Sequence, residues 1–182
     1  MKPLFLSCCL LFLAGCASTQ PSVPHGTLLF YVKITNVALG KAPAGDTGVF
    51  LFSEDDHVTA YEMRAGSVRA TYSRDPAETA SLSQDIAAID FIPFDFEAEV
   101  KNATIRREAR LKAAGKSALM RFDLDGSEFE IGFDGPKGKF VLRYWNPGSK
   151  IDDLAGDSEN IAKLKRLIDR FAAYYGQSRF GL

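Results

Sequence analysis

Alternation of apolar and polar residues dominates this sequence and recurs in short runs separated by turn residues. In "TLLFYVKITNV" the apolar residues Leu28, Phe30, Val32 and Ile34 occupy every second position. Because successive side chains of a strand point to opposite faces, this run predicts a long strand with one apolar face. The runs "GVFLF", "HVTAYEM" and "SVRATYS" predict further strands, the first of them buried on both faces.

Further alternating runs follow in the second half of the chain. The runs "ALMRFDL", "EFEIGF" and "KFVLRYW" are joined by "DGS" and "DGPKG", which supply the Asp and Gly of tight hairpins. They predict an antiparallel meander. In "FDFEAEV" the side chains of Phe94, Phe96, Ala98 and Val100 would face one way and the carboxylates the other, which predicts a half-buried strand.

Two segments carry helical signals. Asp75 is a candidate N-cap, Pro76 suits the first helical position and Glu78 completes a capping box, so a short helix is expected here. Near the end of the chain, Ser158 and Gly176 bracket the best helical pattern. Its apolar stripe consists of Ile161, Leu164, Ile168, Phe171, Ala172 and Tyr175. The segment 102–114 fits neither period.

These patterns predict a single α+β domain over residues 27–182. It contains a mainly antiparallel β-sheet or sandwich, one short helix, and a C-terminal amphipathic helix packed on the sheet.

The first residues form a leader. Lys2 precedes about a dozen apolar residues, which is the composition of a secretory signal and too short to span a bilayer. The leader ends in "LAGC", and these four residues resemble the lipobox of bacterial lipoproteins. The resemblance covers the leader alone, residues 1–15 and Cys16. It implies that the leader is removed and that Cys16, acylated with chains such as palmitate, becomes the membrane anchor.

The residues after Cys16 suggest to which membrane the protein is sorted and how the domain is connected to its anchor. In Gram-negative lipoproteins an aspartate after the anchor favours the inner membrane, and here Ala17 stands in that place. The resemblance therefore implies an outer-membrane location with the domain in the periplasm. Residues 16–26 are small, polar and broken by Pro21 and Pro24, so we expect them to form a tether.

Composition excludes several function classes. Cys8, Cys9 and Cys16 are the only cysteines and lie in the leader or at the anchor, so no disulfide or cysteine chemistry is expected in the domain. With only His25 and His57 in addition, no zinc site of nitrogen and sulfur ligands and no metal or other cofactor is expected. A net charge of −1 gives no indication of nucleic-acid binding.

Carboxylates offer the main catalytic hypothesis, beside the nucleophile and base types in "SEDDH". On a strand, Asp95, Glu97 and Glu99 would stand about 6.6 Å apart, which lies within the range of glycosidase carboxyl pairs. An exposed strand face does not raise a carboxyl pKa, so a solvated sheet face is the better interpretation. Likewise "SEDDH", which includes His57, reads as a hairpin loop, and the acids of "DLDGSEFE" read as a turn rather than a calcium loop.

Two segments are candidate binding sites. Between Lys101 and Lys116 the chain carries six basic side chains and only one acid, Glu108. The binding candidates among the basic residues are Arg106, Arg107, Arg110 and Lys112. Such a patch suits anionic lipid head groups or an acidic protein surface, and the alternative is a solvated face. At the chain end, Tyr174, Tyr175 and Phe180 are candidate interface anchors, or else core residues.

The expected function is accordingly that of a non-enzymatic, outer-membrane-anchored lipoprotein whose domain binds another envelope component. The partner would be an assembly machine or a target that the protein inhibits. Two alternatives remain open: an envelope hydrolase using the carboxylates, and a carrier of lipid or another apolar ligand, suggested by 14 phenylalanines.

Overall fold

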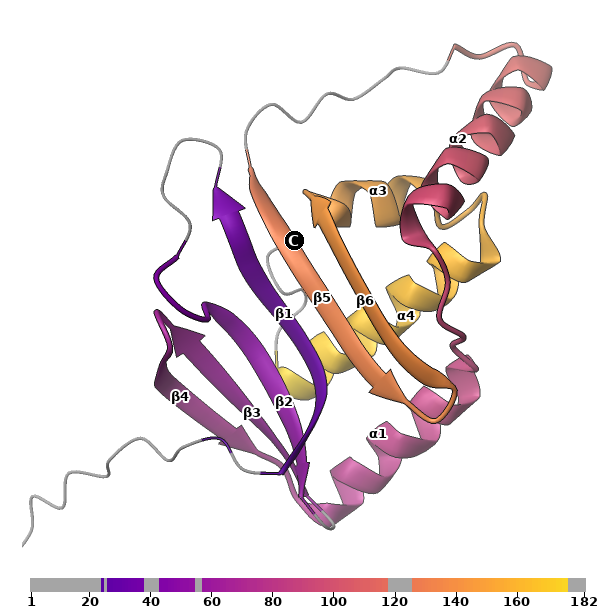
Figure 1. Cartoon of the computed structure of the whole chain (residues 1–182). Coiled ribbons are helices and arrows are strands. Elements are labelled where there is room, and N and C mark those ends of the chain that lie inside the picture. Colours follow the sequence, from indigo (N-terminus) through magenta and orange to yellow (C-terminus); the bar gives the residue numbers. More distant parts are fainter. Residues whose placement is uncertain (1–23, 25, 38–42, 55–56, 118–125, 177–182) are drawn as a thin grey trace, which may run out of the picture.

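A computed structural model describes residues 24, 26–37, 43–54, 57–117 and 126–176. The elements in these residues are β1 (Thr27–Val37), β2 (Gly48–Glu54), β3 (His57–Arg64), β4 (Ser67–Ser73), α1 (Pro76–Ile89), α2 (Phe96–Ala113), β5 (Ser127–Gly135), β6 (Gly138–Trp145), α3 (Pro147–Leu154) and α4 (Glu159–Tyr175). The strands form one antiparallel sheet in the order β4-β3-β2-β1-β5-β6; α4 crosses behind it and α1 runs along its lower margin in the view of Figure 1. The expected α+β class is confirmed.

The core lies between the sheet and α4, and aromatic rings fill much of it. Phe30 on the central strand β1 stacks on Phe171 of α4, with ring centroids 4.2 Å apart. Towards β6, Phe91 packs edge-on against Phe133 and Phe140. All five rings are buried. The helices therefore cover one face of the sheet, which we call the helix face, and the opposite face is called the helix-free face.

The two helices predicted from capping residues are confirmed. Asp75 caps α1 by accepting a hydrogen bond from the Glu78 backbone N–H at 2.8 Å. Ser158 caps α4 by accepting from the Ile161 N–H at 3.2 Å, and Gly176 ends the helix in the left-handed conformation. Every residue of the predicted apolar stripe of α4 is buried.

The prediction of a strand in "FDFEAEV" is wrong. Asp95 is the N-cap of α2 and accepts a hydrogen bond from the Ala98 N–H at 3.0 Å. The alternating pattern is coincidental, because a helical stripe of Phe96, Val100 and Ala103 is what becomes buried. The ambiguous segment 102–114 continues the same helix. The strand expected in "ALMRFDL" falls entirely outside the described residues, and α3 was not predicted.

The two edges of the sheet differ in regularity. In the ladder between β3 and β4, Glu62 pairs with Ala70 and the next residue, Met63, pairs with Val68, which leaves Arg69 as an extra residue in a bulge. At the other edge, β6 pairs with β5 without a register shift.

Candidate functional site

The second half of α2 projects from the domain. Its first turns are fastened by the buried side chains of Phe96, Val100 and Ala103, whereas most residues from Ile105 onward are exposed. Figure 1 shows this helix rising away from the sheet. Burial of an apolar stripe normally fixes a surface helix, so a different force must hold this half in place.

Three arginines supply that force by bridging α2 to the end of α3 and to the link between α3 and α4. Arg110 forms a bidentate pair with Asp157, at 2.7 and 2.8 Å. Arg107 lies 3.3 Å from Asp153. Arg106 donates to the Asp157 carbonyl oxygen and to Glu99, both at 2.6 Å. The three arginines of the basic patch predicted from the sequence are therefore paired with acids from outside its own segment, and the binding role of the patch stays a prediction.

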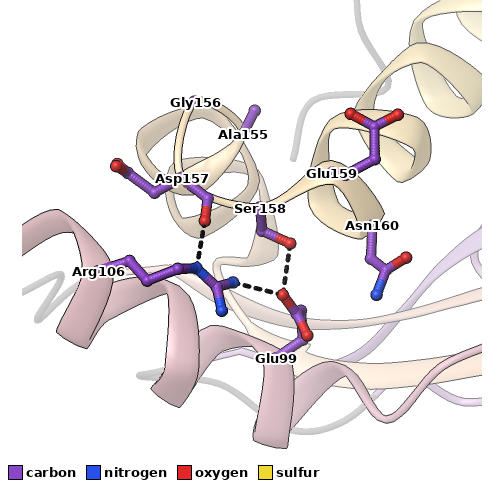
Figure 2. Close-up of a pocket in the computed structure, with 8 residues that line it drawn as sticks. All are labelled: Glu99, Arg106, Ala155, Gly156, Asp157, Ser158, Glu159 and Asn160. Atoms are coloured by element: carbon purple, nitrogen blue, oxygen red, sulfur yellow. Dashed lines mark hydrogen bonds and ion pairs between the residues drawn. The ribbon is translucent and has the colours of Figure 1, made fainter.

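An open, polar pocket of about 410 Å³ lies at this junction (Figure 2). It is lined by Glu99, Arg106, Ala155, Gly156, Asp157, Ser158, Glu159 and Asn160. Inside it, Ser158 donates a 2.6 Å hydrogen bond to Glu99, which also holds Arg106. One carboxylate thus connects α2 to the start of α4.

The charges in this pocket are fixed in their ionised forms. The hydrogen bond from Ser158 and the contacts with Arg106 hold the pKa of Glu99 below its usual range. The bond from Arg110 does the same for the pKa of Asp157. An ionised carboxylate cannot serve as a general acid, and Ser158 already accepts from the α4 backbone. The arrangement suits a joint between helices.

The geometry behind the hydrolase hypothesis does not hold. Asp95, Glu97 and Glu99 lie in the cap and first turn of a helix, so the spacing of side chains on a strand does not apply to them. Asp95 is used as the cap and Glu99 in the pocket. His57 lies exposed at the start of β3, opposite Glu54 at the end of β2. The acids Asp55, Asp56, Asp123 and Asp125 lie outside the described residues.

The aromatic candidates at the chain end are core residues where they are described. Tyr174 and Tyr175 are each 5% exposed. The Tyr174 hydroxyl donates to the Val58 carbonyl at 3.1 Å, and the Tyr175 hydroxyl donates to Glu62 at 3.2 Å. Their burial agrees with the alternative interpretation as core residues, and a role of these two tyrosines as interface anchors stays a prediction. Phe180 and Cys16 lie outside the described residues.

A network on the helix-free face was not predicted. Glu130 on β5 accepts hydrogen bonds from Tyr31 at 2.8 Å and from Arg143 at 2.6 Å, and Lys33 lies 3.0 Å from it. Burial alone would raise the pKa of Glu130, but the three donors outweigh it and lower the pKa to about 2. Burial and the bond to Glu130 raise the pKa of Tyr31. The alternation of "EFEIGF" gave no sign that this glutamate is buried.

No cluster of His, Cys, Asp or Glu suited to a metal ion occurs among the described residues. Among the helices of that same part, none is long and apolar enough to cross a membrane. Comparisons with protein-family models, curated proteins and solved structures found no match.

Proposed function

We propose that this chain is a lipoprotein held at the outer membrane through Cys16, whose domain binds another envelope protein through the projecting half of α2. The "LAGC" sequence supports the anchor. The α2 arm, defined as residues 104–113, supports the binding role. Anchoring raises the effective concentration of the domain near partners on the same surface.

The observation that carries the binding role is that the α2 arm is exposed yet bridged by its arginines to α3 and to the link between α3 and α4. The hydrogen bond from Arg106 to the Asp157 carbonyl and the ion pairs of Arg107 and Arg110 connect a segment that buries little to the rest of the domain. Exposed ion pairs contribute little to overall stability, so their combined effect is to set the position of the arm. A contact surface that is ordered in advance loses less conformational entropy on binding.

One face of this helix offers a contact surface. Lys101, Ile105 and Lys112 follow each other at helical spacing on the same side, with Glu108 between the last two. Ile105 is 57% exposed. Within the described part of the chain, Lys101 and Lys112 take part in no ion pair. An apolar centre flanked by unpaired lysines favours a partner surface that is acidic around an apolar contact.

The test is site-specific photocrosslinking in the native envelope. A photoreactive residue at position 105 should yield a discrete crosslinked protein. The same residue at Gln84, exposed on α1, serves as the matched control and should not. Lys112→Glu should weaken the crosslink at position 105. Equal crosslinking at both positions, or none at position 105, would contradict the binding surface.

The anchor is tested separately. Cys16→Ser should move the protein from the membrane fraction to the soluble periplasmic fraction. A variant that still sediments with membranes would refute the proposed anchor without bearing on the α2 arm. The carrier alternative gains no support, because Phe30, Phe133 and Phe171 fill the space between β1, β5 and α4.

A further inference from the structure

On the helix-free face, charged side chains alternate in sign across the three strands β1, β5 and β6. Lys33 on β1 lies opposite Glu130 on β5, at 3.0 Å. Glu130 lies opposite Arg143 on β6, at 2.6 Å. Two pairs further along the same face, beyond Gly132 and Val141, Asp134 on β5 lies opposite Lys139 on β6, at 3.0 Å. From β1 through β5 to β6 the charges are therefore basic, acidic and basic. Strand β6, which carries the last basic residues, is the edge strand of the sheet.

Strand β6 is a regular edge with exposed side chains. Its eight residues pair with β5 without a bulge, and no hydrogen bond among the described residues reaches its outer backbone groups. Lys139 and Arg143 have side chains 79% and 58% exposed. Between them, Val141 is 60% exposed. Edge β4, by contrast, is interrupted by the bulge at Arg69.

We propose that β6 receives an extended segment of another protein as a seventh strand. The segment carries an acidic residue opposite Lys139, an acidic residue opposite Arg143 and an apolar residue opposite Val141. Its acids are therefore four residues apart and flank a central apolar side chain. Backbone hydrogen bonds to β6 supply the affinity of such strand addition, and the cross-strand pairs supply its specificity.

The occupant comes from another protein because this chain offers no suitable segment. Residues 1–23 and 177–182 contain no Asp or Glu, and the two acids of 118–125 stand only two positions apart. A second copy of β6 would bring further cations beside Lys139 and Arg143, which is unfavourable. The inference does not depend on the α2 arm or on Cys16.

The experiment uses the full chain, purified in detergent, and a synthetic acidic peptide, acetyl-STETVTETS-amide. The control peptide, acetyl-STKTVTKTS-amide, replaces both acids with lysine. At millimolar peptide, hydrogen exchange of the β6 amides should slow with the acidic peptide only. The fluorescence of Trp145, the single tryptophan of the chain and the last residue of β6, gives the binding curve.

Single substitutions test whether the acidic peptide binds at β6. Lys139→Glu should weaken binding of the acidic peptide about three- to tenfold, and Lys139→Gln should weaken it less. Lys112→Glu makes the same charge change on α2 and should leave the titration unchanged. Lys112→Glu is expected to weaken only the crosslink at position 105, and Lys139→Glu only the binding of the peptide. Failure of the α2 proposal and failure of the β6 proposal are therefore distinguishable.

Three results would overturn the proposal. One is equal protection of β6 by the acidic and the lysine peptides, which would mean that charge plays no part. Another is the absence of protection by the acidic peptide. The third is a sedimenting dimer of the free protein with protected β6 amides, which would make a second copy the occupant.

Discussion

The ring of Tyr31 lies over the backbone of Gly132, and a β-carbon at position 132 would come within 2.0 Å of Tyr31 Cε1. The two residues are cross-strand partners on β1 and β5. With no side chain beneath it, the Tyr31 ring stacks on Phe50 at 5.8 Å and its hydroxyl reaches Glu130 at 2.8 Å. Gly132 thus determines where the Glu130 network can form.

Substitution of this glycine should destabilise the domain. Gly132→Ala displaces the Tyr31 ring and weakens its bond to Glu130, so we expect a loss of about 1–3 kcal/mol in the free energy of unfolding, measured in urea. Gly156→Ala is the control, because a β-carbon there meets no atom within 4 Å. It should change stability by less than about 0.5 kcal/mol. Equal effects of the two changes would refute the steric explanation.

The Glu130 carboxylate should make the free energy of unfolding depend on pH. Its pKa is lowered from 4.5 to about 2 in the folded chain, so its contribution is present above pH 4.5 and is lost as the pH falls towards 2. The shift corresponds to at most roughly 3 kcal/mol. Glu130→Gln should therefore be less stable at pH 7, with the difference shrinking in acid. Urea titrations at several pH values test this, and parallel curves for the two proteins would contradict it.

Loss of one arginine bridge should loosen the α2 arm without unfolding the domain. Arg110→Ala removes the bidentate pair with Asp157, and amide exchange in residues 104–113 should become several-fold faster while α4 is unchanged. Lys112→Ala serves as the control because no ion pair of Lys112 occurs among the described residues. Unchanged exchange in Arg110→Ala would mean that packing, and not the bridge, holds the arm.

The hydroxyl of Tyr174 should stabilise the contact of α4 with α1 and β3. It accepts from Thr79 at 3.0 Å and donates to the Val58 carbonyl at 3.1 Å. Tyr174→Phe leaves both groups without this partner, and we expect a cost of roughly 1–2 kcal/mol in thermal or urea unfolding. In the described part of the chain the hydroxyl of Tyr144 has no hydrogen bond, so Tyr144→Phe is the matched control. A similar loss in both variants would refute the role of the hydroxyl.

Local signals in the sequence were sufficient to predict those elements that have both capping residues at their ends and an apolar stripe on their buried face. For α4, the Ser158 cap, the apolar stripe and Gly176 agree. For α2 they conflict, because the alternation around Phe96 and Glu97 imitates a strand. The α2 arm buries little, so it leaves no apolar period to detect. The partners of Arg107 and Arg110 lie more than forty residues away, and only the folded chain brings them together.

The bulge at Arg69 has a consequence for stoichiometry. A protein whose sheet can be extended at both margins can polymerise, because each added molecule brings a second open margin of the same kind. Here one margin is irregular and the other is regular. If β6 receives a strand as proposed, β4 offers no second site for the same pairing. Each molecule would then take up one segment, which favours a one-to-one complex over a fibre built from copies of this sheet.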